Sequence, residues 1–279
     1  MAVRVVTDSA CDVPEALAAE LGIEVVPLSV RFGDTEYVDR RDLTPAAFYA
    51  KMASSPELPE TAAPSPGAFE ETFRRLLDSG ADSVVCIDIS SSLSATMQSA
   101  ANAVTALGDD ADVRLVDSRS VSWGLGSQVV AAARAAAKGA SAEEVVALVD
   151  DMIARTRVFA ALDTLENLKK GGRIGGAQAL LGTLLSIKPV IDISSGVVEE
   201  AGKPRTRSKA MRFLADKVAQ HGQLENLGVM HGDAADVDQF VDLLGSICPR
   251  DQIHVDLIGA TIGAHGGPRI LGVTFQVAG

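Results

Sequence analysis

Short, mostly apolar segments of strand length, each followed by a helical pattern, dominate the first half of the chain. Residues 3–8, 84–89 and 113–117 are rich in Val, Ile and Leu, and helical periodicity follows each of them. Strands separated by helices are typical of βαβ units, whose parallel sheet is covered on both faces. The pattern therefore predicts an α/β fold with a three-layer, parallel-sheet domain. Ligands of such sheets bind beyond the carboxyl ends of the strands, where this chain has Thr7-Asp8-Ser9, Ser90 to Ser94 and Asp117-Ser118.

The other segments of the first half continue this alternation. We expect helices over residues 12–22, 45–53, 67–80 and around 129–138, the first three starting at Asp12, Thr44-Pro45 and Ser65-Pro66. We expect one strand over 23–32, a polar hairpin over 33–42 and a loop over 54–66.

An amphipathic helix over residues 141–157 is expected to lead into a second half of different character. There a hairpin-like segment, 196–207, is mixed with helices, and two strands over 252–259 and 271–277 end the sequence. Hairpins mixed with helices predict a smaller α/β domain with α+β character. We place the boundary near residue 157.

Composition excludes several classes of protein. The 279 residues are 47% hydrophobic and 22% charged, with a net charge of −12, which disfavours binding to nucleic acid. Cys11, Cys86 and Cys248 have no metal-ligand spacing and indicate reduced thiols. Arg4 and Asp8 interrupt any signal peptide, and no run reaches the roughly 18 apolar residues of a membrane span. We expect a cytoplasmic protein.

The junction in VVCIDISSSLSATMQSAANAV is the first candidate site. The strand ends in three serines, and apolar residues at helical spacing follow at once, so Ser92 is expected to cap the helix. The free N–H groups of Leu93, Ser94 and Ala95 would then point out of the first turn, beside the Ser94 hydroxyl. Unpaired donors and the positive helix end favour a carboxylate or phosphate. Alternatively, the serines only cap a helix.

A second candidate is the segment GGRIGGAQALLGTLLSIKPVI. Its run over residues 177–187 is uncharged and rich in Ala and Leu, which suits either a core helix or the wall of a pocket for an alkyl chain. Arg173 and Lys169-Lys170 beside it could face an acid group, a partner or only solvent.

Other candidates are polar residues in loops. Thr61 lies in a proline-bounded loop, where Ser65 is expected only to cap a helix. The segment KPRTRSKA places Arg205, Arg207 and Lys209 together in an otherwise acidic chain, as a positive patch or a solvated hairpin tip.

The segment IGATIGAHGGPRILG has His265 among five glycines, a density typical of tight turns or close approach to a ligand. His231, at a strand end, is an intermediate candidate, whereas His221 and His254 are expected to be structural or exposed.

Motifs of common enzymes are absent from the sequence. WGLGSQVV lacks the third glycine of a dinucleotide loop, and there is neither a phosphate-binding GxxxxGK[ST] loop nor a GxSxG elbow. A Ser94–His265 nucleophile pair is conceivable, but the sequence assigns no residue behind the histidine. We expect no cofactor and no metal.

Six segments occur in the order VTDSACD, ETAAPSPGAF, SSSLSATMQSA, LENLKKGGRI, KPRTRSKA and IGAHGGP. Together they resemble the DegV family of fatty-acid-binding, FakB-type proteins, over nearly the whole chain. The resemblance implies two domains, residues 1–157 and 158–279, with one long-chain fatty acid buried between them. It also implies a carrier without enzymatic activity, which presents the carboxylate to a separate fatty acid kinase for acyl phosphate formation.

The resemblance also implies roles for individual residues. The family's carboxylate-binding threonine and serine correspond to Thr61 and Ser94, and its nearby histidine to His265. Arg173 and Arg205 are implied in the head-group and partner surface. Leu93, Ala95 and Gly266 complete the expected ligand-binding set. The chain departs from the family's usual pattern at Ala62-Ala63, Ala95, Met97 and Arg269.

Three functions remain to be weighed. The first is a fatty acid carrier. The second is a hydrolase or acyl transferase that uses Ser94 with His265. The third is a binding protein for a phosphorylated or polyol ligand, which is considered because this fold also occurs in dihydroxyacetone-kinase-type subunits. The apolar run disfavours the third, and the missing elbow and the lack of an assignable acid disfavour the second. We expect the carrier.

Overall fold

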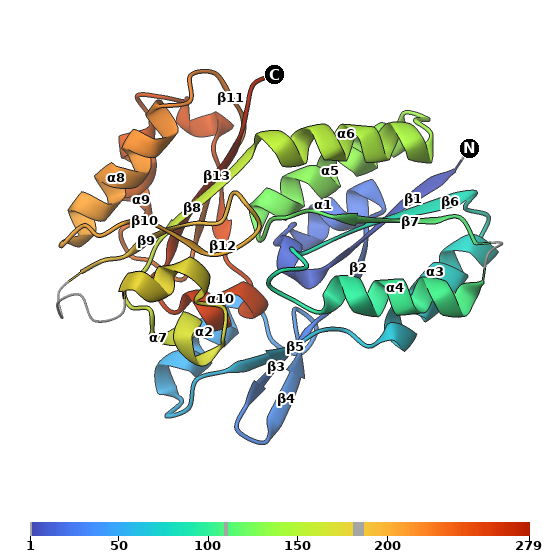
Figure 1. The fold of residues 1–279 in the computed structure, drawn as a ribbon, viewed down its shortest axis with the longest axis horizontal. Helices are drawn as coiled ribbons and strands as arrows, with labels where there is room; N and C mark the ends of the chain where they lie inside the picture. The colour runs from blue at the N-terminus through green and yellow to red at the C-terminus, as the bar shows by residue number, and fades with distance from the viewer. Residues whose placement is uncertain (1, 109–110, 181–186) are drawn as a thin grey trace.

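A four-stranded parallel sheet forms the centre of the first half (Figure 1). The computed structural model describes residues 2–108, 111–180 and 187–279. Within them, β2 (Glu24–Val26), β1 (Val3–Asp8), β6 (Ser83–Asp88) and β7 (Val113–Asp117) lie side by side in that order, all parallel. The predicted parallel α/β arrangement is therefore confirmed.

Helices cover both faces of this sheet because alternate strand residues point to opposite sides. On one face, Val6 and Val84 pack with α3 (Pro66–Asp78) and α4 (Thr96–Leu107). On the other face, Val5 and Val85 pack with α5 (Trp123–Ala137) and α6 (Ala142–Arg155), beside α1 (Glu15–Leu21).

A six-stranded mixed sheet forms the second half. Its order is β10 (Glu199–Gly202), β9 (Val190–Asp192), β8 (Thr156–Ala161), β13 (Leu271–Val277), β11 (Leu224–His231) and β12 (His254–Leu257). In β8, Val158 and Ala160 join the core of α5 and α6, whereas Phe159 and Ala161 pack with α8 (Arg207–Ala219) and α9 (Val237–Leu244). Helices α5 and α6 thus lie between the two larger sheets.

A small antiparallel sheet was only partly predicted. It consists of β4 (Thr35–Val38), β3 (Ser29–Phe32) and β5 (Glu60–Ala62). The expected single strand over 23–32 is wrong: Pro27, which has no N–H to donate, separates β2 from β3, and the two belong to different sheets. The expected loop over 54–66 is also partly wrong, because it contains β5.

Three further helices lie near the small sheet: α2 (Pro45–Ser54), α7 (Glu166–Lys170) and α10 (Ala260–Gly266) (Figure 1). Helix α10 lies where the glycine-rich segment predicted turns. Short 3-10 helices complete the fold: η1 (Ser9–Cys11), η2 (Gly175–Leu180) and η3 (Arg250–Gln252).

Most predicted helix starts are confirmed by their capping bonds. Thr44, Ser65 and Ser141 each accept a hydrogen bond from the backbone of the following turn, and Ser141 forms a full capping box with Glu144. The expected cap at Asp12 is wrong. Helix α1 begins at Glu15, and Asp12 is buried with a φ of 51°.

The segment WGLGSQVV forms the first turns of α5, earlier than the expected alanine-rich helix. Gly124 and Gly126 both lie close to neighbouring atoms. A Cβ added at Gly124 would stand 2.2 Å from Ser120 Oγ, and a Cβ added at Gly126 would stand 2.3 Å from the Cys11 carbonyl oxygen. Their role is therefore close packing.

The predicted domain boundary near residue 157 lies at the start of strand β8, at Thr156. The boundary itself stays a prediction. Among the described residues, no helix is long and apolar enough to cross a membrane.

Candidate functional site

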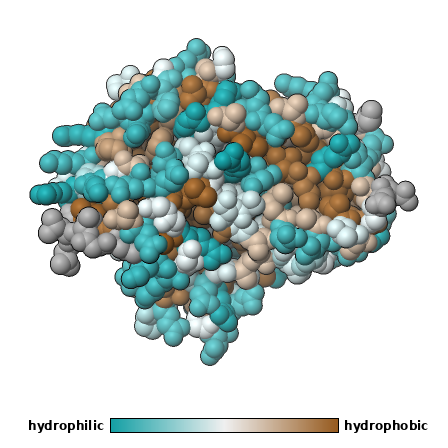
Figure 2. All heavy atoms as spheres, in the orientation of Figure 1, coloured by the Kyte–Doolittle hydropathy of each residue, from teal (hydrophilic) through white to brown (hydrophobic). Residues whose placement is uncertain are grey.

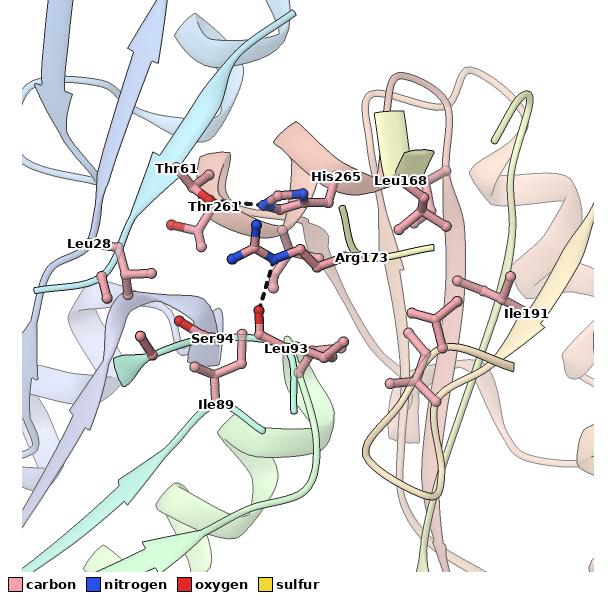
Figure 3. A pocket seen from close by; sticks show the side chains of 18 residues that line it. Leu28, Thr61, Ile89, Leu93, Ser94, Leu168, Arg173, Ile191, Thr261 and His265 are labelled. Carbon is pink, nitrogen blue, oxygen red and sulfur yellow. Dashed lines mark hydrogen bonds between the residues drawn. The ribbon is translucent and has the colours of Figure 1, made fainter. Parts of the chain in front are cut away.

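A pocket lies between elements of the two halves of the chain (Figure 3). Its cavity volume is about 120 Å³, and the pocket is partly open to solvent. Its walls are mainly aliphatic, and they come in part from the loop that follows β6, from α7 and from β9. The aliphatic lining includes Leu28, Ile89, Leu93, Leu168, Ile191 and Ile193. Such a surface favours an apolar ligand.

One end of this pocket is polar. The side chains of Thr61, Ser94, Arg173, Thr261 and His265 gather there, from four segments that are distant in sequence, the last two from α10 (Figure 3). Glu60 and Ala62 on either side of Thr61 are exposed, so the alternation of β5 turns the threonine inward. The structure therefore places four predicted site residues, Thr61, Ser94, Arg173 and His265, around one cavity.

Thr61 and His265 form a direct hydrogen bond. Thr61 Oγ1 lies 2.8 Å from His265 Nε2. Burial, and to a lesser extent the charge of Arg173, lower the pKa of His265 to about 4, so the ring is neutral at pH 7. Nδ1 is buried without a partner among the described residues. Because an orphaned buried N–H is rarer than an unsatisfied acceptor, we assign the proton to Nε2. The Thr61 hydroxyl then accepts from histidine and keeps its own hydrogen for a ligand.

Arg173 connects the two sides of the polar end. Its Nε donates to the Leu93 carbonyl at 3.0 Å, and its Nη1 donates to the Gly171 carbonyl at 2.7 Å. These bonds fix the guanidinium between His265 and Ser94 (Figure 3). A cation held there favours an anionic ligand group.

The helix next to Ser94 begins later than predicted. Helix α4 starts at Thr96, and Ser92 does not cap it. The N–H groups of Leu93 and Ser94 are not free, because both donate to the Ser90 carbonyl, at 2.9 and 3.1 Å. The Ser94 hydroxyl instead lies 2.8 Å from Thr96 Oγ1 and accepts from the Thr96 N–H at 3.3 Å. Ser94 thus contributes a side-chain hydroxyl to the pocket, and Leu93 and Ala95 line its wall.

A buried polar network behind the pocket was not predicted. Asp39 Oδ2 accepts from Ser9 Oγ at 2.8 Å and from Thr261 Oγ1 at 2.7 Å. Ser9 Oγ in turn accepts from the Leu28 N–H at 3.1 Å. Since Leu28 and Thr261 both line the pocket, Asp39 links two of its walls. Nothing in the local sequence around Asp39, which lies in a polar hairpin segment, predicted that it would link these walls.

Asp12 holds the start of α10 in the same region. It accepts from the Gly259 N–H at 2.9 Å, from Ser122 Oγ at 2.6 Å and from Arg40 at 3.2 Å. Burial raises the pKa of Asp12 to about 6, although Arg40 opposes this effect. Asp12 therefore positions the helix that carries His265.

A polar groove adjoins the pocket on the side of the Thr61–His265 bond. It shares Thr61, Arg173 and His265 with the pocket, and Lys170 and Glu57 also line it. The polar end of the pocket is consequently approachable from a hydrophilic surface.

Several other predicted residues lie outside the pocket. Arg205 is exposed, without a hydrogen bond or ion pair to any described residue, and Arg207 is paired with Asp236. His254 stacks on Trp123, and His231 Nδ1 accepts from the Ala234 N–H. Both histidines have structural roles.

The polar residues at the other strand ends also serve the fold. Asp8 Oδ2 accepts from the Ile89 N–H at 2.7 Å, and Asp117 Oδ1 accepts from the Ser91 N–H at 3.2 Å. Of the expected tail wall, Ala177 and Leu180 are buried, while residues 181–186 lie outside the described residues. Among the described residues, no group of His, Cys, Asp and Glu side chains could hold a metal ion.

A family model for uncharacterised proteins of the DegV family matches residues 2–278. The chain belongs to the DegV family. A DegV domain-containing protein of Streptomyces coelicolor, SCO2569, is 36% identical over 275 residues, which are 97% of this chain and 97% of the relative. The resemblance inferred from the six sequence segments is thus confirmed.

Solved structures of DegV proteins share the fold. A fatty-acid-binding DegV family protein of Thermus thermophilus is 35% identical to this chain, with a TM-score of 0.89. DegV of Bacillus subtilis, a fatty acid binding protein, is 28% identical, with a TM-score of 0.88. Each of these two matches covers 100% of both chains. A stearic-acid-binding protein of Eubacterium ventriosum is 27% identical with a TM-score of 0.84, over 99% of this chain and 98% of that one.

Two positions at which we expect departures from the usual DegV pattern lie at the pocket. Ala63 and Ala95 both line it, so small apolar side chains stand beside the polar end. Gly266, expected in the ligand-binding set, lines it as well. Arg269 lies outside the lining and has a φ of 59°.

Proposed function

We propose that this DegV protein is a carrier that buries one long-chain fatty acid and presents its carboxylate to a fatty acid kinase. The observation that carries the proposal is a single cavity with aliphatic walls and one polar end, where two hydroxyls and a guanidinium converge. Fatty acid binding by three structural neighbours supports it.

The aliphatic walls account for the affinity. Burial contributes about 0.8 kcal/mol per methylene, so a chain of roughly fourteen methylenes gains on the order of 11 kcal/mol before ordering costs. The polar end needs only to orient the ligand. Thr61 and Ser94 donate their hydroxyl hydrogens to the carboxylate, and Arg173 supplies the opposite charge. Neutral His265 holds Thr61 in the donating orientation.

The polar groove supports presentation of the carboxylate rather than its sequestration. Because the groove shares Thr61, Arg173 and His265 with the pocket, a kinase with bound ATP reaches the carboxylate from that side. The kinase transfers the phosphoryl group to a carboxylate oxygen, which gives an acyl phosphate and ADP. Arg173 beside the carboxylate and the exposed Arg205 are proposed to face the kinase.

The contacts of Ser94 and His265 argue against a serine hydrolase. His265 is bonded to Thr61 and Ser94 to Thr96, and no described acidic side chain bonds to His265 Nδ1. A nucleophilic serine needs a base that is itself oriented by a third group. We therefore propose that the protein has no catalytic activity of its own.

Native mass spectrometry of the purified protein, before and after organic extraction, tests the carrier. We expect a mass increment equal to one long-chain fatty acid, which extraction removes and added fatty acid restores. A purified bacterial fatty acid kinase with ATP should then produce acyl phosphate only when the loaded protein is present. Binding of no lipid contradicts the carrier, and ester hydrolysis by the isolated protein favours the hydrolase.

A further inference from the structure

The turn of the β9–β10 hairpin is held by two side chains from the first half of the chain. Ser90 Oγ donates to the Gly196 carbonyl at 2.6 Å, and Arg119 Nη2 donates to the Ser195 carbonyl at 2.8 Å. Ser90 lies in the loop after β6 and Arg119 in the loop after β7, whereas the hairpin extends toward them from the second half (Figure 1). We call residues 193–198 the hairpin turn. The two bonds join the halves of the chain at this turn.

The hairpin forms one wall of the pocket. Ile191 and Ile193 are two residues apart, so both side chains face the pocket, and Val198 lines it from the other side of the turn. Ile89 and Val121 line the pocket from the first half. Figure 3 shows Ile191 across the pocket from Ile89. Because each residue of the two bonds is at most two positions from a lining residue, movement of the turn would part these two walls.

The outer part of the hairpin is anchored weakly apart from these two bonds. Within the described residues, β10 is an edge strand that pairs only with β9, with a shift of register along the pair. The Val198 carbonyl accepts one further bond, from the Gly176 N–H at 2.8 Å. The wall formed by α10, in contrast, is tied to the first half by the buried carboxylates of Asp12 and Asp39. The hairpin is therefore the wall that separates from the first half at lower cost.

The contact between the hairpin turn and the first half is close. Gly196 has a φ of 90°, and a Cβ added to it would stand 3.2 Å from both Ser90 Oγ and the Cβ of Arg119. Arg119 has a φ of 48°, in the left-handed region that is unfavourable for residues other than glycine. An unfavourable backbone conformation is thus retained where the Arg119 side chain reaches Ser195.

Both bonds can break without leaving a buried group unpaired. Arg119 and Ser195 are exposed, so water replaces their bond. Ser90 is buried, but its Oγ also accepts from the Ser92 N–H at 3.3 Å and keeps this partner. Figure 2 shows mostly hydrophilic and intermediate side chains at the centre of this face, where the two halves meet. Water therefore has access to the junction when the turn moves.

We propose that Ser90 and Arg119 are positioning residues that latch the hairpin turn, and that release of this latch opens the wall through which the fatty acid tail enters and leaves. The inference rests on the proposed function. Neither side chain lines the pocket, so neither contributes contacts to the ligand. A latch that is closed most of the time, with and without the tail, scales the rates of association and dissociation by the same factor. The two side chains are thus assigned to the rates of exchange and not to the affinity.

Removal of either bond tests the latch. In Ser90→Ala and in Arg119→Ala, association and dissociation of a fluorescent fatty acid should each become about 3- to 10-fold faster in stopped-flow measurements, with an affinity within about twofold of wild type. Arg119→Lys keeps a cationic donor and should exchange the ligand at rates closer to wild type.

Two matched controls break similar bonds elsewhere. Ser79 Oγ donates to the Leu76 carbonyl at 2.8 Å, and Arg157 Nη1 donates to the Thr156 carbonyl at 2.8 Å. Ser79→Ala and Arg157→Ala should exchange the ligand at wild-type rates. Lower stability of the latch variants without faster exchange would assign the two latch residues to the fold alone.

A disulfide across the contact supplies the opposite perturbation. The 3.2 Å between the Cβ of Arg119 and a Cβ added at Gly196 is only slightly below the about 3.5–4.5 Å of disulfides, so Arg119→Cys combined with Gly196→Cys should form one. The oxidised variant should exchange its ligand about tenfold or more slowly than wild type, and reduction should restore exchange.

The latch is overturned if Ser90→Ala and Arg119→Ala exchange the ligand like the controls, or if they lose affinity through faster dissociation alone. Exchange by the oxidised variant at the rate of its reduced form also overturns it, because the tail then passes elsewhere. If the disulfide does not form, the alanine variants decide. A wild-type protein that binds no fatty acid contradicts the proposed function itself, whereas normal binding with unchanged rates in the variants contradicts only the latch.

Discussion

Gly171 lies against the imidazole of His265 with no room for a side chain. A Cβ added at Gly171 would stand 2.2 Å from Nδ1 of the ring. The backbone of Gly171 is right-handed, with φ −72°, so space rather than conformation requires glycine here. Its neighbour Gly172 has a φ of 71°, in the left-handed region, so there the backbone conformation requires glycine. The two glycines of the LKKGGRI segment therefore have different physical roles.

The first prediction concerns this contact. Gly171→Ala should push His265 away from Thr61 and weaken fatty acid binding roughly tenfold or less, since a hydrogen bond contributes about 0.5–1.5 kcal/mol. Titration of the delipidated protein with a fluorescent fatty acid measures the change. Gly176→Ala is the control, because its added Cβ meets no atom closer than 3.5 Å. Equal affinities of wild type and Gly171→Ala would show that His265 does not need this packing.

The second prediction is a pH dependence of stability. The pKa of His265 is lowered from about 6.5 in the unfolded chain to about 4 in the fold, so the unfolded state binds more protons between these values. Acidification from pH 7 to 4 should therefore lower the free energy of unfolding by up to about 3 kcal/mol through the protonation of His265 in the unfolded state. His265→Gln should lack this component.

Chemical denaturation of both proteins across that range isolates the effect of His265. Burial raises the pKa of Asp8 to about 7 and that of Asp12 to about 6, which stabilises the fold as pH falls. These opposite contributions are present in both proteins and cancel in the difference. A difference in unfolding free energy that stays constant from pH 7 to 4 would mean that His265 is not buried as described.

The sequence predicted the location of the pocket better than its construction. Ser94 follows β6 and lines the pocket, a position in line with the rule that ligands bind beyond the carboxyl ends of parallel strands. The resemblance to DegV proteins supplied Thr61, Arg173 and His265. The local sequence could not reveal that Thr61 lies in a strand, because β5 has three residues and exists only by pairing with β3.

The failures have a common cause in contacts between distant residues. Capping statistics favoured Ser92, but the Ser90 carbonyl takes the N–H groups of Leu93 and Ser94, and the helix starts later. Asp39 lies in what reads as a polar hairpin, yet its partner Thr261 is 222 residues away. A local sequence pattern does not predict such long-range hydrogen bonds.

The third prediction follows from the position of Asp39. Asp39→Ala should leave the hydroxyls of Ser9 and Thr261 buried without their acceptor, and each such group costs about 1–3 kcal/mol. Urea denaturation should reveal this loss of stability. Asp34→Ala, at an exposed position of the same hairpin, should unfold like wild type. If the two variants are equally stable, Asp39 does not hold the pocket walls together.

The last prediction separates the polar end of the pocket from its walls. Thr61→Ala and Ser94→Ala should each weaken binding of a fatty acid by about 10- to 150-fold, because a hydrogen bond to a charged group contributes about 1.5–3 kcal/mol. Both changes should weaken binding of the matching fatty acid methyl ester much less, because its carbonyl accepts only the weaker, uncharged hydrogen bonds and its affinity relies on the aliphatic walls. Ser65→Ala serves as the control: it lies four residues from Thr61 but only caps α3, so it should lower stability by about 1 kcal/mol and leave both affinities unchanged. Equal losses for acid and ester would instead indicate that the variants reshape the apolar cavity, and the assignment of Thr61 and Ser94 to the carboxylate would then be wrong.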